Sequence, residues 1–218
     1  MTPSGTAADL WDVAFTDRMN GWAVGVLATG EETGSPIILA TTDGGARWHA
    51  QTVPAGVDSL KAVQFIDDET GWAIGTPGVV LRTTDGGSTW KRSRLAPQAN
   101  PLDLDFVDGK YGWVCGTIGL GGNFGYHTVN GGLTWTRESI PGDVSSAVDF
   151  IDRKHGYRVG DSGLVAATSD GGKTWNFLPT SAPSSYLFDV RMWGDGTGYV
   201  VGQFGTIMKT VTGGEGPK

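Results

Sequence analysis

Carboxylates are the residues of this chain that could most directly do chemistry, because two of them facing each other across a sugar hydrolyse glycosides. The candidates in predicted loops are Glu31, Glu32, Asp58, Asp143 and Asp161. None belongs to a recognisable pair flanked by aromatic residues, and the adjacent Glu31 and Glu32 are typical of a solvated loop tip. The sequence therefore predicts no catalytic carboxylates.

A second set of aspartates recurs at regular intervals, each shortly before a Gly-aromatic pair: Asp17, Asp67, Asp108 and Asp152. A catalytic residue is needed once, whereas a repeated turn needs the same side-chain acceptor each time. We predict that these aspartates cap turns.

Nucleophilic and metal chemistry lack the necessary partners. His49, His127 and His155 lie far apart in the sequence and have no fixed Ser or Cys partner. Cys115 is the single cysteine, so it forms no internal disulfide, and its apolar surroundings are typical of an inert buried thiol. The sequence has no Cys/His spacing typical of metal sites and no glycine-rich phosphate loop. It predicts no enzyme, no cofactor and no metal site.

An eight-residue motif of the type Thr-x-Asp-Gly-Gly-x-Thr-Trp decides the architecture. It occupies residues 41–48, 83–90, 128–135 and 168–175, and a decayed copy stands at 210–214. Its Asp position falls at 43, 85, 130, 170 and 212, which gives spacings of 42, 45, 40 and 42 residues. A fixed period of about 40–45 residues is the signature of a repeat fold.

Each motif has the chemistry of a tight hairpin. The Asp or Asn side chain can accept hydrogen bonds from the following amides, Gly-Gly permits positive φ, and the Trp buries a large apolar surface. A calcium loop would need further carboxylates that the motif lacks. We therefore assign a structural role to Asp43, Trp48, Asp85, Trp90, Asn130, Trp135, Asp170 and Trp175.

The motif resembles the Asp-box, or bacterial neuraminidase repeat, of sialidases and sortilin-type receptors. Each copy follows a segment that ends in Gly-aromatic-x-x-Gly, at residues 21–25, 71–75, 112–116, 156–160 and 198–202. The composite unit is similar to the photosystem II stability and assembly factor type of propeller. This resemblance implies a β-propeller that holds a peptide on a basic surface outside the cytoplasm. It covers nearly the whole chain.

Each repeat contains four predicted strands, A to D, with the Asp-box between C and D. We predict an all-β fold: a β-propeller of about five four-stranded antiparallel blades, the last lacking its own outer strand. One domain would span 1–218, with repeats at approximately 10–57, 58–99, 100–143, 144–184 and 185–214. Residues 1–8 could supply the missing strand and close a monomeric ring, or the chain could be part of a larger ring.

The candidate binding residues lie in the B–C connections and at one position of strand C. The B–C connections are long at 26–36 and 117–125 and short elsewhere. Three residues before the Asp position stand Ala40, Arg82, His127, Ala167 and Lys209, so basic side chains of three blades could form one surface, which Arg18, Lys110, Arg153 and Lys154 could extend. The predicted binding set is Arg82, His127, Lys209, Asn123, Phe124, Tyr126, Asp161 and Gln203. Solvent-facing strand residues would explain the same positions.

Function stays open among three hypotheses. The first is a non-enzymatic scaffold or assembly-factor-like propeller that binds a partner protein or peptide. The second is a carbohydrate-binding or glycan-processing propeller, favoured by the loop aromatics Phe124, Tyr126, Tyr186 and Phe204, although a sialidase would need a cluster of three arginines that the scattered arginines do not predict. The third is an excised or designed repeat array without activity.

Charge and hydropathy narrow the range of possible binding partners. The net charge of -7 disfavours nonspecific binding to nucleic acid. No apolar run is long enough to span a membrane, and the N-terminus has no basic region or apolar run typical of a signal peptide. Localisation cannot be read from the sequence, whereas the family resemblance implies an extracytoplasmic location.

Overall fold

The computed structural model describes residues 5–27, 34–119, 121–138, 140, 142, 144–181 and 185–213. Glu31, Glu32, Asp143 and residues 1–4 of the predicted closing segment therefore lie outside the described residues. The chain divides into two compact units, Met1–Pro101 and Leu102–Lys218. The single domain and its repeat boundaries stay predictions.

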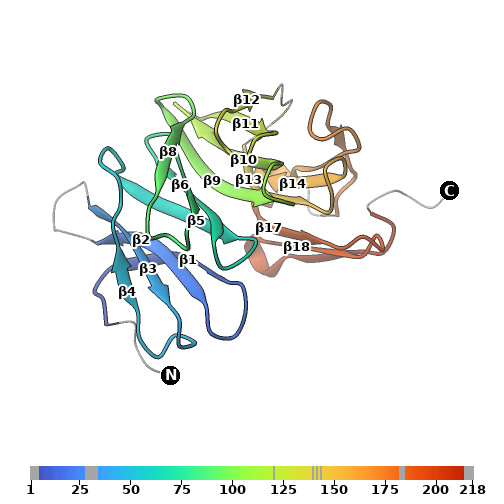
Figure 1. The fold of residues 1–218 in the computed structure, drawn as a ribbon. Coiled ribbons are helices and arrows are strands. Elements are labelled where there is room, and N and C mark those ends of the chain that lie inside the picture. Colours follow the sequence, from blue (N-terminus) through green and yellow to red (C-terminus); the bar gives the residue numbers. More distant parts are fainter. Residues whose placement is uncertain are drawn as a thin grey trace. The chain divides into compact units, whose positions relative to one another are not determined.

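The first unit contains two antiparallel four-stranded sheets (Figure 1). One comprises β1 (Asp9–Phe15), β2 (Gly21–Leu27), β3 (Ser35–Thr41) and β4 (His49–Gln51) in that order. The other comprises β5 (Ser59–Phe65), β6 (Thr70–Thr76), β7 (Val79–Thr84) and β8 (Lys91–Arg94). Each strand pairs with the next along the chain, as consecutive strands joined by short turns do.

The second unit contains three antiparallel sheets. The first strand of the third sheet, β9 (Ala99–Phe106), spans the division between the two units. The third sheet adds β10 (Gly112–Ile118), β11 (Gly122–Thr128) and β12 (Thr136–Arg137). The fourth has β13 (Ser145–Phe150), β14 (Gly156–Gly160), β15 (Val165–Thr168) and β16 (Asn176–Phe177). Within the described residues the fifth has β17 (Leu187–Met192), β18 (Gly198–Gly202) and β19 (Ile207–Thr210). Two short 3₁₀ turns, η1 (Asp161–Gly163) and η2 (Gln203–Gly205), connect strands of the last two sheets.

The predicted all-β fold is confirmed, and among the described residues the last sheet ends at β19. Runs of apolar residues explain the strands, and β2, β6 and β10 each contain five consecutive buried residues, so both of their faces are covered. One prediction was wrong: residues 117–125 are mostly strand rather than loop, because β10 runs to Ile118 and pairs with β11 from Gly122. The connection proper is therefore short.

Aromatic side chains join neighbouring sheets in a repeated way. In the first unit the Trp22 ring of β2 stacks on the Phe65 ring of β5 at a centroid distance of 3.5 Å, and Trp90 meets Phe65 edge-on at 5.9 Å. The indole of Trp22 also donates to the carbonyl of Gly86 in the next Asp-box, at 3.1 Å. Stacked and T-shaped pairs add specific geometry to the burial of apolar surface.

The second unit repeats this arrangement. Trp113 stacks on Phe150 at 3.5 Å, Trp175 meets Phe150 edge-on at 5.8 Å, and Trp113 donates to the carbonyl of Gly171 at 3.0 Å.

Glycine is required where the aromatic ring of strand A lies close to strand B. In the first unit a Cβ on Gly71 would lie 2.6 Å from the ring of Phe65. Packing therefore explains the Gly-aromatic pattern.

The Asp-boxes share one hydrogen-bond pattern. In the second sheet the Thr83 hydroxyl donates to Asp85 and accepts from the Gly87 amide, both at 2.8 Å, and Asp85 accepts from the Thr89 amide at 2.8 Å. Gly86 and Gly87 have φ of 67° and 84°, which explains the Gly-Gly pair. In the fourth box the hydroxyl and amide of Thr174 lower the pKa of Asp170 to about 2.

Candidate functional site

The recurring aspartates before strand B act as turn acceptors. Asp17 accepts from the amides of Met19 and Asn20 at 2.6 and 2.7 Å. Asp67, Asp108 and Asp152 accept from the equivalent amides of their own turns. The amides of Asn20 and Met19 lower the pKa of Asp17. These carboxylates are committed to the backbone and are poorly placed for chemistry.

A hollow of about 470 Å³ lies over two of these turns, beside Asp108, Asp152, Arg153 and Lys154. The Arg153 guanidinium contacts Asp108 at 2.7 Å and lies 4.5 Å from the ring centroid of Tyr111. Because Asp108 compensates Arg153, this hollow is less basic than the sequence indicates.

The three basic residues of strand C occupy equivalent positions in different sheets. Arg82, His127 and Lys209 each pair across to the aromatic residue of strand B. Their contacts differ: His127 lies 3.5 Å from the Glu138 carboxylate, and the Lys209 ammonium lies 5.6 Å from the ring centroid of Tyr199. Arg82 belongs to the first unit and is half-buried. A common basic surface stays a prediction.

Two predicted binding residues prove to be core residues. Phe124 is 1% exposed and Tyr126 is 9% exposed, and their rings meet at a centroid distance of 5.4 Å. Both belong to β11, where alternate side chains point inward, so the interpretation of them as loop aromatics was wrong. Asn123, at the start of the same strand, donates its side-chain amide to the carbonyl of Gly142.

Asp161 lies in η1 and Gln203 in η2, the B–C turns of the last two sheets. The Gln203 side chain accepts from the Tyr186 amide at 3.3 Å, and the Gln203 amide donates to the Tyr186 carbonyl at 2.8 Å. Burial raises the pKa of Tyr186, and the charge of Asp161 adds to this. Phe204 is 91% exposed at the tip of η2 with φ of 57°. Asp58 lies in the first unit, where its amide donates to Thr76.

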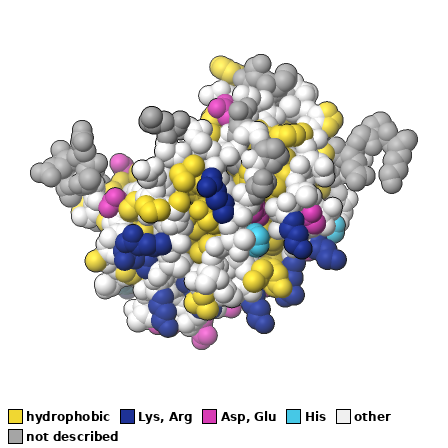
Figure 2. All heavy atoms as spheres, turned by 90° about the horizontal axis from the view of Figure 1, so that it is seen from above, with side chains coloured by type: hydrophobic (Ala, Val, Ile, Leu, Met, Phe, Trp, Pro, Cys, Tyr) yellow, Lys and Arg dark blue, Asp and Glu magenta, His cyan; other side chains and the backbone are white. Residues whose placement is uncertain are grey.

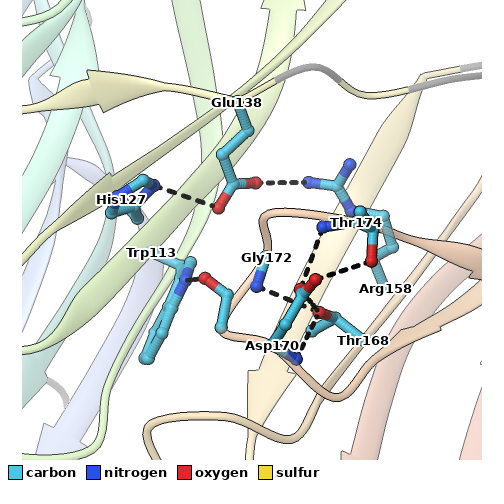
Figure 3. A network of polar contacts seen from close by, with 9 residues as sticks. Trp113, His127, Glu138, Arg158, Thr168, Asp170, Gly172 and Thr174 are labelled. Atoms are coloured by element: carbon cyan, nitrogen blue, oxygen red, sulfur yellow. Dashed lines mark hydrogen bonds and ion pairs between the residues drawn. The ribbon is translucent and has the colours of Figure 1, made fainter.

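A buried ionic network joins the third and fourth sheets (Figure 3). Glu138 follows β12 and lies between His127 and Arg158, at 3.5 and 3.7 Å. The side chains of Glu138 and Arg158 are each 2% exposed, and the Arg158 guanidinium lies 4.2 Å from the ring centroid of Trp175. Burial lowers the pKa of Arg158, although arginine stays protonated in proteins.

In the first unit the position equivalent to Glu138 holds an uncharged side chain. Gln51 occupies the position of Glu138, donates to the Gly86 carbonyl at 2.8 Å and accepts from the Trp90 indole at 3.1 Å. In the second unit the Trp175 indole nitrogen, Glu138 Oε1 and two guanidinium nitrogens of Arg158 are buried and have no hydrogen-bond partner among the residues that the structure describes. The network is therefore an electrostatic pair with little hydrogen bonding.

Sequence reasoning missed this network, although a signal was present. Arg158 interrupts an apolar strand B at a position where the other repeats have Ala23, Ala73, Val114 and Val200. Gly125 makes room for the pair, since a Cβ there would lie 2.8 Å from Glu138 Oε2 and 2.9 Å from Arg158 Nη2.

Carboxylates of strand A link neighbouring sheets within each unit. Asp12 accepts from the Val63 amide and Asp103 from the Val148 amide, both at 2.8 Å. Asp105 and Asp149 likewise accept from the amides of Phe150 and Met192. Burial raises the pKa of Asp103 to about 8, although the Val148 amide acts to lower it. A strongly shifted pKa makes a residue a candidate for a functional site. The hydrogen bond of Asp103 also holds two sheets together, so it has a structural role as well.

An apolar cavity lies in the second unit, between the fourth and fifth sheets. Its volume is about 290 Å³. One wall comprises Leu178, Pro179, Thr180 and Ser181 beyond β16, and the other comprises residues of β17, β18 and β19, including Met192 and Met208. A concave apolar surface with a few polar groups at its rim is the usual form of a binding site.

Other chemistry finds no support in the described part of the chain. There, no group of three or more His, Cys, Asp or Glu side chains could hold a metal ion. Burial raises the pKa of the Cys115 thiol, which opposes thiolate chemistry. No helix within the described ranges is long and apolar enough to cross a membrane.

Comparison with known proteins identifies curated relatives. The chain is 32% identical over 128 residues to the photosystem II assembly lipoprotein Ycf48 of Synechococcus sp. (strain CC9902), covering 56% of this chain and 37% of the relative. It is 34% identical over 71 residues to the chloroplastic photosystem II stability/assembly factor HCF136 of Arabidopsis thaliana, covering 32% and 16%. The matches thus span little more than a third of the relatives at most.

Solved structures show the same fold. YCF48 bound to D1 peptide matches with a TM-score of 0.50 and 19% identity, covering 95% of each chain. Virginiamycin B lyase from Staphylococcus aureus matches at 0.71 and 11%, covering 94% of this chain and 71% of the lyase. The GH74 enzyme of Niastella koreensis matches at 0.64 and 16%, covering 98% and 31%. At these identities the likeness shows the β-propeller fold and nothing about activity.

The repeat pattern and the packing that it dictates agree with the family comparison. A family described as "Photosynthesis system II assembly factor YCF48" matches residues 4–99 and 139–217, well over half of the chain. The chain belongs to this YCF48 assembly-factor family.

Proposed function

We propose that this chain holds an extended peptide segment of a partner protein, as an assembly factor does, and does no chemistry on it. Membership of the YCF48 family is the observation that carries the proposal. Three of the carboxylates described above agree with it, since Asp17 caps a turn, Asp12 accepts a backbone amide and Glu138 pairs with Arg158. A solved member of this fold is YCF48 bound to D1 peptide, which makes the D1 peptide the first ligand to test.

The proposal extends to location. The relatives include a lipoprotein and a chloroplastic factor, which supports work outside the cytoplasm. The carbohydrate-binding alternative loses two of its four aromatic residues, because Phe124 and Tyr126 are buried. The likeness to a lyase and to GH74 enzymes concerns the fold and supplies no catalytic residues.

Titration of a fluorescently labelled D1 peptide with the full chain, followed by anisotropy, tests this proposal. We expect saturable binding that a scrambled peptide of the same composition does not reproduce. A panel of chromogenic glycosides should remain intact at the same protein concentration. Absence of peptide binding, or glycoside turnover at enzyme-like rates, would overturn the proposal.

A further inference from the structure

The third Asp-box, residues 128–135, has asparagine where the other complete boxes have aspartate. Asn130 occupies this position and Gly131 follows it. The equivalent residues of the other complete boxes are Asp43, Asp85 and Asp170. An asparagine before a glycine is open to attack by its own backbone, because glycine has no side chain to shield its nitrogen. The third box is therefore a candidate site of chemical modification.

The reaction of such a pair is deamidation through a cyclic imide. The Gly131 backbone nitrogen, after loss of its proton, bonds to Cγ of Asn130, and the side-chain nitrogen leaves as ammonia. Water then opens the imide ring. Cleavage between the ring nitrogen and Cγ gives aspartate, whereas cleavage between the ring nitrogen and the backbone carbonyl carbon gives isoaspartate. The sum is asparagine plus water giving an acidic residue plus ammonia, so no oxidant or reductant is needed.

The closed box holds both reacting groups away from this reaction. The Gly131 amide is buried and donates to the Lys110 carbonyl at 2.8 Å. Oδ1 of Asn130 accepts from the Thr128 hydroxyl at 2.9 Å and from the Thr134 amide at 3.0 Å, while Nδ2 donates to the Thr134 hydroxyl at 2.8 Å. Attack requires the amide to leave its acceptor and the side chain to turn toward it. The reaction therefore depends on local opening of the box.

An aspartate at this position fits the closed box. In the second box the Thr89 hydroxyl donates to Asp85 at 2.6 Å, and in the fourth box the Thr174 hydroxyl donates to Asp170 at 2.7 Å. These hydroxyls lower the pKa of both carboxylates. The third box can form the same bond by rotation of the Thr134 hydroxyl, and a bond to a carboxylate is stronger than one to an amide. The aspartate product would therefore close the box again.

Isoaspartate does not fit the closed box. Its main chain runs through the former side-chain carbonyl, which inserts a methylene between Cα of residue 130 and the next amide. The box needs two amides after this point to reach acceptors before it: Gly131 donates to the Lys110 carbonyl and Gly132 to the Thr128 hydroxyl, at 2.8 and 2.9 Å. The inserted methylene displaces both amides from their acceptors. The isoaspartate product would therefore keep the box open.

A second pair of the same type, Asn20 and Gly21, lies in the first unit and gives an internal comparison. The Asn20 side-chain amide donates to Asp17 at 3.0 Å and to Asp68 at 3.1 Å. Aspartate at position 20 would replace this donor by a third carboxylate, and the like charges would repel one another. The fold thus accepts the acidic product at position 130 and opposes it at position 20.

We propose that Asn130 is a site of spontaneous deamidation, protected while the third Asp-box is closed and reactive when it opens, whose aspartate product restores the box and whose isoaspartate product keeps it open. Water is the co-reactant, and the modification needs no enzyme. The inference goes beyond the proposed function, because it concerns chemical ageing of the chain and involves no partner. The third box would accumulate a record of its own openings.

Incubation of the full chain in mildly alkaline buffer, followed by tryptic digestion and mass spectrometry with electron-transfer fragmentation, measures the reaction at each asparagine. Asn130 lies in the tryptic peptide 111–137 and Asn20 in the peptide 19–47. We expect Asn130 to deamidate at least about tenfold more slowly in the folded chain than in guanidinium chloride. Equal rates in the folded and unfolded chain would overturn the inference, because the closed box would then give no protection.

A matched pair of variants tests whether box opening controls the rate. Thr128→Val removes the hydroxyl that joins Asn130 to the Gly132 amide, and it should speed deamidation of Asn130 severalfold. Thr83→Val makes the same change in the second box and should leave the rate at Asn130 unchanged. Asn20 in the same samples reports global unfolding. Equal rates at Asn130 in both variants, or a parallel rise at Asn20 in Thr128→Val, would contradict local control by the third box.

The two products have separate tests. Asn130→Asp should melt at or above the wild-type temperature, whereas Asn20→Asp should melt below it. Lys110 is exposed, and Figure 2 shows Lys and Arg side chains at the protein surface. Because an open box frees the Lys110 carbonyl, brief trypsin treatment of aged native protein should release the peptide 111–137 enriched severalfold in isoaspartate over aspartate. A lower melting temperature for Asn130→Asp than for Asn20→Asp, or no enrichment, would overturn the assignment of the products.

Discussion

Replacement of Glu138 by glutamine probes the buried ionic network most sharply. The change removes one charge from a pair whose side chains are each 2% exposed, at a nitrogen–oxygen distance of 3.7 Å. At an effective dielectric constant of about 20 the lost attraction is about 4 kcal/mol. Breaking a buried pair by removing one partner generally costs about 3–5 kcal/mol, because the other charge stays buried. A new bond from the Trp175 indole, like that from Trp90 to Gln51, would return about 1 kcal/mol. We expect a net loss of roughly 3 kcal/mol.

The first unit shows how the loss can be repaired. Its equivalents of Gly125, Glu138 and Arg158 are Ile38, Gln51 and Ala73. The triple variant Gly125→Ile, Glu138→Gln and Arg158→Ala therefore copies a neutral packing that the chain already uses. A buried pair can be replaced by apolar groups at little cost, although the isoleucine at position 125 must also displace the Ile140 side chain, whose Cδ1 would lie against the new Cβ. We therefore expect the triple variant to be more stable than Glu138→Gln alone.

Urea unfolding followed by tryptophan fluorescence and circular dichroism measures these differences. The exposed Glu69→Gln provides the matched control and should change the unfolding free energy by less than about 0.5 kcal/mol. The reasoning would be refuted if Glu138→Gln behaved like this control. It would also fail if the triple variant were no more stable than the single one.

Three further predictions address other parts of the fold. Burial raises the pKa of Asp103 from the ordinary 3.8 of an aspartate to about 8, so between these pH values the folded chain keeps a proton that the unfolded chain has lost, and rising pH lowers stability. Relative to Asp103→Asn, the wild type should lose roughly 2 kcal/mol of unfolding free energy in urea between pH 5 and 8, a value discounted because the residue is half-buried. Parallel pH profiles of the two proteins would contradict this. Gly71→Ala should cost about 1–3 kcal/mol through contact with Phe65, whereas Gly194→Ala, which meets no atom within 4 Å, should be nearly neutral in thermal melts; equal losses would count against the packing account. Cys115 should resist alkylation by iodoacetamide at pH 8 until the protein is unfolded, as mass spectrometry can test, since burial raises its pKa; prompt labelling of the folded chain would show that the thiol is accessible.

The architecture could be predicted because one local unit repeats. Asp43, Asp85 and Asp170 form the same turn in each copy, and the period places a Trp and a Phe where neighbouring sheets stack. Among the described residues the last sheet has three strands, as the decayed final box predicted. The fold could therefore be predicted from short-range interactions that recur in each repeat.

The candidate site was harder to predict, because it depends on departures from the repeat. Phe124 was taken for a loop aromatic since the length of the β10–β11 hairpin cannot be read from its glycines. The Glu138–Arg158 pair joins two sheets through a contact between distant parts of the sequence. The cavity between the fourth and fifth sheets has walls from segments that are distant in the sequence, so it is visible only once those walls are placed.

Hydrogen–deuterium exchange of the full chain, with and without a saturating concentration of D1 peptide, tests the central claim most directly, that this YCF48-family propeller holds a partner peptide. The account predicts slower exchange in a confined set of strands and turns, with no global change. Identical exchange in every segment at a peptide concentration that saturates a family member would contradict it.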